Sequence, residues 1–92
     1  MFVAIAIHHA RPEHVDAFVD YMRRVRDAVG DPPGLVDFHG YRDTRTSRLL
    51  GISHWESEEA FQAALPLIGQ LSDQRRDEWS ERPDDVLMLT RI

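Results

Sequence analysis

The two ends of the chain carry apolar runs that do not alternate with polar residues. Phe2–Ile7 reads Phe-Val-Ala-Ile-Ala-Ile, and Val86–Leu89 reads Val-Leu-Met-Leu. Successive residues of a strand point to opposite faces of its sheet, so strands of this kind are apolar on both faces. Any fold that contains both strands must therefore cover both faces of the sheet at these positions.

Between the two ends, helical spacing of apolar residues appears twice. A first helix is expected to open at Arg11-Pro12-Glu13, because a first turn tolerates proline, and to end at Gly30 before the stiff loop Asp31–Gly34. A second helix is expected from Ser57 to about Leu65. Pro66 and Gly69 should interrupt it, and a further helical segment should reach Trp79 before Pro83 ends the region.

The remaining segments predict a sheet. We expect strands at Phe2–His9, Leu35–Asp43, Arg48–Trp55 and Asp84–Ile92. The resulting order β-α-β-β-α-β is typical of an α+β, ferredoxin-like domain with a four-stranded antiparallel sheet and both helices on one side. Residues 1–92 form one such domain. A second copy of the sheet is the simplest cover for the other face, which predicts a symmetric homodimer with its sheets packed face to face.

Residues 35–55 predict a hairpin with the turn Thr44–Ser47. If Asp43 pairs with Arg48, Gly40 lies directly opposite Gly51, which leaves a hollow for an aromatic ring, a close backbone or a ligand. This register places two sets of residues on opposite faces. The first set is Val36, Phe38, Gly40 and Arg42 against Trp55, Ser53, Gly51 and Leu49, and the second is Asp37, His39 and Tyr41 against His54, Ile52 and Leu50.

Trp55 stands at the corner where the hairpin runs into the second helix. Ser57 can cap that helix with its hydroxyl, and Glu58 and Glu59 follow where the helix dipole favours anions. We expect the indole to fill the corner of the core, a role compatible with contact to a ligand.

Composition excludes several kinds of function. The net charge of −5 argues against nucleic acid or an anionic membrane as a partner. With no cysteine and no lysine, disulfides, thiolate chemistry and lysine Schiff bases are absent. The apolar start Met1–Ile7 has no basic leader and is too short to span a bilayer, so a cytoplasmic protein is expected. The five histidines show no recognised ligand spacing, and no metal site is predicted.

The corner Trp55-Glu56-Ser57-Glu58-Glu59-Ala60-Phe61, following the hairpin from Gly34-Leu35 to Gly51, resembles the antibiotic biosynthesis monooxygenase (ABM) family, as do Pro12-Glu13 and Phe18 of the first helix. The resemblance covers nearly the whole chain and implies a dimeric α/β-barrel. The family includes cofactor-independent oxygenases of quinols and polyketide aromatics, haem-degrading enzymes and members without known activity. The haem-degrading branch uses a strand asparagine and a helical tryptophan and histidine. This chain has no asparagine, and Ala64 and Gln74 occupy the other two positions.

The first hypothesis is therefore a monooxygenase that oxidises an aromatic quinol without a cofactor. His54, oriented by Asp37, is the candidate base, with His39 as a second candidate. Trp55, Tyr41, Gly40, Gly51 and Phe38 are expected to bind the small aromatic substrate. A pair of His54 and Asp37 could equally be a structural cross-strand pair. The second hypothesis is a dimeric ligand-binding or accessory module without catalysis, since a fold can host either.

Overall fold

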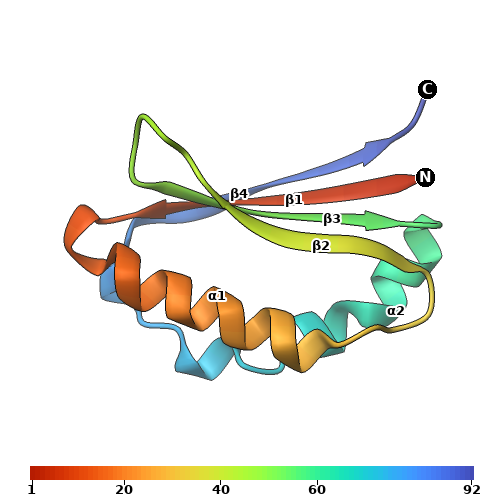
Figure 1. Ribbon diagram of the computed structural model, residues 1–92, viewed down its shortest axis with the longest axis horizontal. Helices are drawn as coiled ribbons and strands as arrows, with labels where there is room; N and C mark the ends of the chain where they lie inside the picture. Colours follow the sequence, from red (N-terminus) through yellow and green to blue (C-terminus); the bar gives the residue numbers. More distant parts are fainter.

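The computed structural model describes all 92 residues and has the predicted element order (Figure 1). The strands are β1 (Phe2–Ala10), β2 (Leu35–Arg42), β3 (Arg48–Trp55) and β4 (Ser80–Thr90), and the helices are α1 (Val15–Val29) and α2 (Glu58–Ile68). Short 3₁₀ turns occur at η1 (Pro12–His14), η2 (Ser72–Gln74) and η3 (Asp77–Trp79). The strands form one antiparallel sheet in the order β2-β3-β1-β4. Both helices lie on the same side of it, which confirms the ferredoxin-like α+β fold.

The hairpin has the predicted register over most of its length. Asp37 to Arg42 pair with His54 to Leu49, and Gly40 lies opposite Gly51. The register shifts between Leu35 and Asp37, so that Trp55 opposes Leu35 instead of the predicted Val36. Val36 is the extra residue of this bulge and is 54% exposed.

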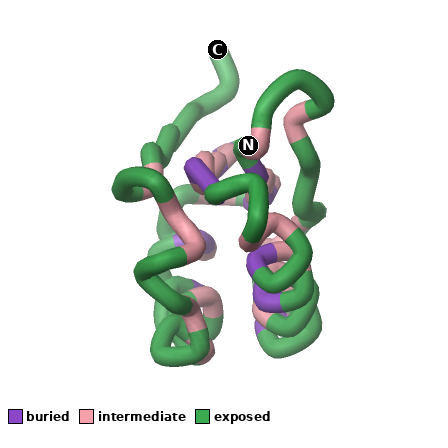
Figure 2. Tube along the Cα trace, turned by 90° about the vertical axis from the view of Figure 1, so that its left-hand side faces the viewer, coloured by how far each residue is buried: buried purple, intermediate pink, exposed green.

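Two apolar clusters hold the helices on the sheet, and buried residues lie where the two layers meet (Figure 2). In the first, the completely buried Trp55 packs edge-on against Phe61 of α2 and donates its indole N–H to Ser53 Oγ at 2.8 Å. In the second, Phe18 and Tyr21 of α1 pack with Leu49. The predicted corner is thus confirmed, including the helix cap, in which the amide N–H of Ala60 donates to Ser57 Oγ.

The structure differs from the prediction at three points between α2 and β4. Helix α2 continues through Pro66 to Ile68, because the proline falls in the last turn and removes only one helical hydrogen bond. After Gly69 the chain forms η2 and η3 instead of a further helical segment. Strand β4 begins at Ser80, before Pro83, since an edge strand tolerates a residue without an N–H, and the pairing with β1 is irregular there.

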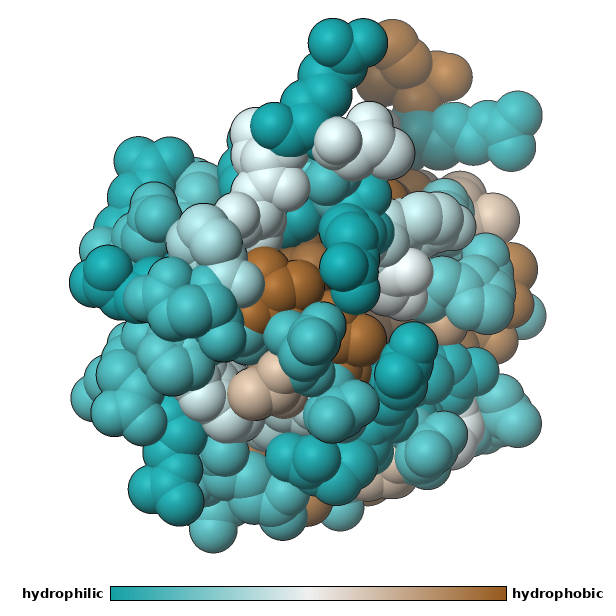
Figure 3. All heavy atoms as spheres, turned by 60° about the vertical axis from the view of Figure 1, so that its left-hand side comes forward, coloured by the Kyte–Doolittle hydropathy of each residue, from teal (hydrophilic) through white to brown (hydrophobic).

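No helix covers the second face of the sheet. By the strand register, this face carries Val3, Ile5 and Ile7 of β1 beside Leu87 and Leu89 of β4. The last two side chains are 45% and 43% exposed. A space-filling view from another side shows a mostly hydrophilic surface with apolar atoms near its middle (Figure 3). None of the helices is both long and apolar enough to cross a membrane.

We expect Trp55→Ala to lower the free energy of unfolding by about 3–5 kcal/mol, because it removes a large buried side chain and leaves a cavity. Urea unfolding followed by circular dichroism measures this change. Val36→Ala, at an exposed bulge, is the control and should change stability by less than about 0.5 kcal/mol. Equal midpoints for the two variants would contradict the role of the corner.

Candidate functional site

The floor of the candidate site is a row of small side chains that crosses the sheet. The strand register aligns Val86, Ala6, Gly51 and Gly40 in one row. Ala4 and Ser53 in the adjacent row are also small, whereas Phe2 and Trp55 at one end and Leu49 at the other are large. The sheet surface therefore forms a trough beneath the helices.

A cavity of about 320 Å³ lies between this trough and the helices. Its walls are mostly apolar, and the helical part of the lining comes from both α1 and α2. These residues are Tyr21, Met22, Val25, Arg26, Phe61, Leu65 and Ile68. A cavity of this kind is the usual form of a small-molecule site: a largely apolar space with a few polar groups.

The polar groups gather at the β1–β4 side of the cavity. His8 Nδ1 lies 3.0 Å from Asp84 Oδ2, a close contact that lacks the alignment of a hydrogen bond. Arg75 donates to both oxygens of Asp84, each at 2.6 Å, and its guanidinium stacks 4.8 Å from the centre of the Phe18 ring. His8 and Asp84 retain only 13% and 21% of their side-chain exposure.

The contacts with Arg75 and His8 determine the ionisation of Asp84. Burial alone would raise the pKa of Asp84, but two hydrogen bonds from Arg75, together with the close contact of His8, outweigh burial and hold the pKa well below the usual carboxyl range. The same bonds raise the pKa of Arg75. Tyr21 lines the cavity close by, and burial raises the pKa of its phenol. The structure thus places a stable carboxylate beside the imidazole of His8.

At the β2 side, Arg26 fixes α1 to the sheet. Its guanidinium donates to the carbonyls of Phe38, at 2.8 Å, and Gly30, at 3.0 Å. A Cβ on Gly40 would approach the methyl group of Met22 to 3.3 Å, and one on Gly51 would lie 3.8 Å from the Phe38 ring. The predicted hollow over the two glycines is therefore present on the cavity floor, and Met22 and Phe38 fill part of it.

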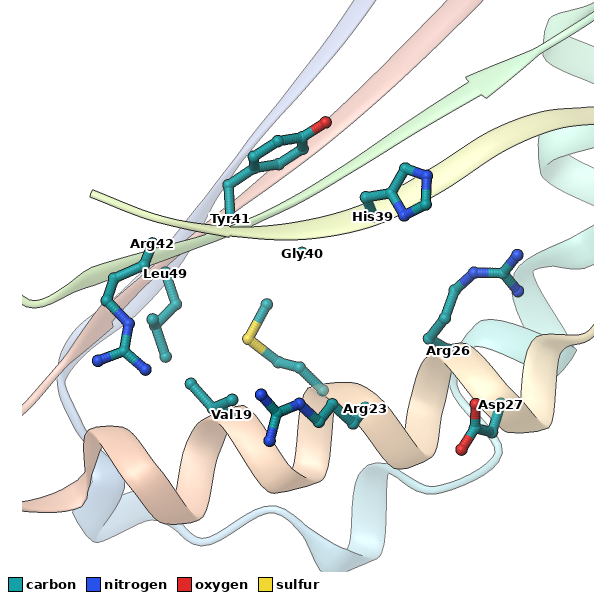
Figure 4. Close-up of a pocket in the computed structure, with 10 residues that line it drawn as sticks. Val19, Arg23, Arg26, Asp27, His39, Gly40, Tyr41, Arg42 and Leu49 are labelled. Carbon is teal, nitrogen blue, oxygen red and sulfur yellow. The ribbon is translucent and has the colours of Figure 1, made fainter. Parts of the chain in front are cut away.

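Beyond Met22 lies a second hollow of about 320 Å³, between α1 and β2. We call it the arginine groove, since its lining includes Arg23, Arg26 and Arg42 (Figure 4). It shares Met22, Arg26 and Gly40 with the cavity. The close-up shows His39 and Tyr41 with their rings on the far side of the strand from α1.

The residues proposed from sequence do not form one pocket. Gly40, Gly51 and Phe38 line the cavity, whereas Trp55 is buried in the core beside it. His54, Asp37, His39 and Tyr41 belong to the uncovered face. Asp37 and His54 lie opposite each other across the hairpin, as the predicted register requires, but their side chains make no ion pair. The Asp37 carboxylate instead lies 2.7 Å from His39 Nε2, since residues two apart on a strand share a face. His54 Nδ1 is buried without a hydrogen-bond partner.

Four residues of the cavity lining were not predicted from the sequence: His8, Tyr21, Arg75 and Asp84. The alternation of side chains along β1 could have indicated the position of His8. It lies on the same face as Phe2 and Ala4, which the helices bury. His8 and His9 are adjacent on β1 and therefore point to opposite faces: His8 packs against Phe18, with ring centres 4.9 Å apart, while His9 Nε2 hydrogen-bonds with Asp85 at 2.8 Å. No group of three or more His, Asp or Glu side chains is placed to hold a metal ion.

The structure is that of an α+β domain of ferredoxin-like topology with a mostly apolar cavity between its helices and its sheet. The model of the family described as antibiotic biosynthesis monooxygenase matches residues 1–66, and the chain belongs to this family. No relative was found among curated proteins.

Solved structures share the fold over the whole chain. One described as an antibiotic biosynthesis monooxygenase has 15% identity and a TM-score of 0.83, covering 100% of this chain and 99% of its own. Rv0793 from Mycobacterium tuberculosis has 18% identity and a TM-score of 0.84, with coverages of 99% and 94%. The haem degrader MhuD from the same organism, solved with two haems in its active site, has 23% identity and a TM-score of 0.78, with coverages of 100% and 96%. At these identities the likeness shows the fold alone.

We expect the ionised Asp84 carboxylate to contribute to the free energy of unfolding, and this contribution to be lost at acid pH. Its pKa is lower in the folded than in the unfolded chain, so its ionisation stabilises the fold above the usual carboxyl pKa of about 4. That contribution is lost as the pH falls toward the folded-state pKa. Urea unfolding from pH 7 to pH 2 should therefore show a shallower loss of stability below about pH 4 in Asp84→Asn than in wild type.

Asp27→Asn is the control for this series, because Asp27 is exposed and makes no ion pair. It should keep the wild-type slope. An Asp84→Asn variant with the same slope as wild type would show that the Arg75–Asp84 contact is not retained in solution.

Proposed function

We propose that the protein is a monooxygenase that oxidises an aromatic quinol or polyketide-type phenol in the cavity between the helices and the sheet, without a cofactor. The observation that carries the proposal is the His8–Asp84 pair at one side of a mostly apolar cavity. Membership of the monooxygenase family agrees with it.

The proposed reaction needs few groups from the protein, because the substrate itself supplies the electrons. Removal of a phenolic proton turns the substrate into an electron-rich anion that can reduce oxygen directly. For an anthrone-like substrate, one oxygen atom becomes the new carbonyl and the other leaves as water with the two hydrogens of the oxidised carbon. The four electrons accepted by oxygen all come from that carbon. The protein must bind the ring, take up the proton and exclude water.

His8 is the group that can take the proton, since it is the only histidine lining the cavity. Asp84 would stabilise the imidazolium that forms, and Arg75 keeps Asp84 ionised in this half-buried place. The apolar walls contributed by α1 and α2 would shield the substrate anion from water. His8 thus replaces His54 as the candidate base, because His54 lies on the other face of the sheet.

The chain lacks the residues that the haem-degrading branch of the family uses. No histidine occurs after His54, so the helical region has none to offer as an axial ligand, and asparagine is absent from the chain. The similarity to MhuD is therefore a likeness of fold, and no step is assigned to haem.

We also propose that two copies pair through the uncovered face of the sheet. This face is apolar over β1 and β4, although no element of the same chain covers it. A second sheet would bury these side chains and give a closed, symmetric assembly. The polar residues Asp37, His39 and Tyr41 would then lie at its margin, on the edge strand β2.

We expect the purified protein to consume oxygen with an aromatic dihydroquinone or anthrone-like substrate, and His8→Ala to lower the rate about 10²–10⁴-fold by removing a positioned base. An oxygen electrode measures the rate, with anaerobic and protein-free samples as background. His54→Ala is the matched variant on the opposite face and should stay within a few-fold of wild type.

If His54→Ala loses the activity while His8→Ala keeps it, the assignment of the base is wrong. A substrate panel with no rate above background, together with ligands that raise the melting temperature, would favour the second hypothesis, a ligand-binding module.

The dimer can be tested at adjacent positions of one strand. We expect Leu87→Arg, on the uncovered face, to convert the protein to a monomer at micromolar concentration in sedimentation-velocity experiments. Val86→Arg, on the helical face and 57% exposed, should leave the dimer intact. A wild-type protein that sediments as a monomer would contradict the assembly.

A further inference from the structure

The arginine groove concentrates positive charge on an acidic protein. Three arginines line it, while the net charge of the chain is −5. The one carboxylate in the lining is that of Asp27, which makes no ion pair with any of the three. An anion that the rest of the surface repels would meet a favourable local potential here.

Two of the three guanidinium groups are free to bind a ligand. Arg26 is occupied by the carbonyls of Phe38 and Gly30, and its guanidinium also lies 3.9 Å from the exposed carboxylate of Asp31. Arg23 makes only a 3.7 Å contact with Asp20, between side chains that are 76% and 66% exposed, and Arg42 makes no ion pair. Both point into the space between α1 and β2 near Val19 (Figure 4). Exposed pairs like Arg23–Asp20 contribute little and exchange readily.

The groove and the cavity adjoin at Gly40, which lines both of them. No side chain projects from the strand at this position, and the separating group is the methyl end of Met22. Methionine is flexible enough to turn aside for a ligand. A flat ligand lying along Ala6, Gly51 and Gly40 would therefore emerge from the cavity between Arg23 and Arg42.

The strand spacing gives the length of such a ligand. His8 belongs to β1 and Arg42 to β2, with β3 between them, so the two backbones are about 9–10 Å apart. A bicyclic aromatic ring with a hydroxyl at one end and a carboxylate at the other spans about this distance. The hydroxyl would reach His8 and the carboxylate the two arginines.

We propose that the arginine groove is a subsite for the carboxylate of an aromatic hydroxy acid whose ring occupies the cavity, so that the substrate class is a phenolic carboxylic acid. The inference rests on the proposed function, because it takes the cavity as the binding site. Arg23 and Arg42 bind the carboxylate by charge-assisted hydrogen bonds, and Met22 marks the passage between the two hollows.

The test compares 6-hydroxy-2-naphthoate with 2-naphthol, which lacks only the carboxylate. Isothermal titration calorimetry in low salt should show about tenfold tighter binding of the naphthoate to wild type. The preference should disappear in Arg23→Gln/Arg42→Gln and shrink as ionic strength rises. Arg24→Gln/Arg45→Gln is the matched control: it removes the same charge outside the groove and should keep the preference.

The outcomes separate this inference from the proposed function. Equal affinities of the two probes for wild type, or the same loss of preference in both double variants, would overturn the carboxylate subsite alone. His8→Ala should weaken both probes by a similar factor and leave the preference, since the imidazole contacts the hydroxyl end. If neither probe binds wild type, both the cavity site and the subsite are wrong.

Discussion

The antiparallel register of the sheet is the constraint on which the rest of the molecule depends. It brings Ala6, Gly51 and Gly40 from three strands into one row, and the lack of bulk there opens the space beneath the helices. A slip of one residue in either ladder would move a larger side chain into the row and turn the glycines to the other face. Trp55 and the bulge at Val36 help to hold that register at the end of the hairpin.

The polar end of the cavity depends on a different kind of interaction. Burying Asp84 is unfavourable for its charge, and the two hydrogen bonds from Arg75 offset that cost. Arg75 lies in the irregular segment between η2 and η3, so the contact with Asp84 also fixes this segment against β4. The stacking of Arg75 on Phe18 extends the same anchor to α1. One ion pair thus connects the chemistry of the site with the packing of its least regular part.

Much of the fold was predictable, because the signals are local. The turn at Thr44–Ser47 and the pairing of Asp43 with Arg48 set the hairpin, and the serine cap and acidic first turn set the start of α2. The errors occur where tertiary context decides. Pro66 does not break α2 because it lies in the last turn, and Pro83 fits in β4 because β4 is an edge strand. The spacing of residues in the sequence does not reveal that the two prolines occupy such positions.

The sequence alone determines the elements, their order, the two faces of the hairpin and the apolar character of β1 and β4, because period and turn chemistry act between near neighbours. It also places Gly40 against Gly51. Only the tertiary structure decides which face the helices cover, and with it which histidine faces a cavity. From the sequence, His54 is the candidate base, but the helices pack over the opposite face of the sheet, which carries His8. The partnership of His8, Asp84 and Arg75 likewise arises only when β4 pairs with β1, since residues so distant in the chain carry no local sign of their contact.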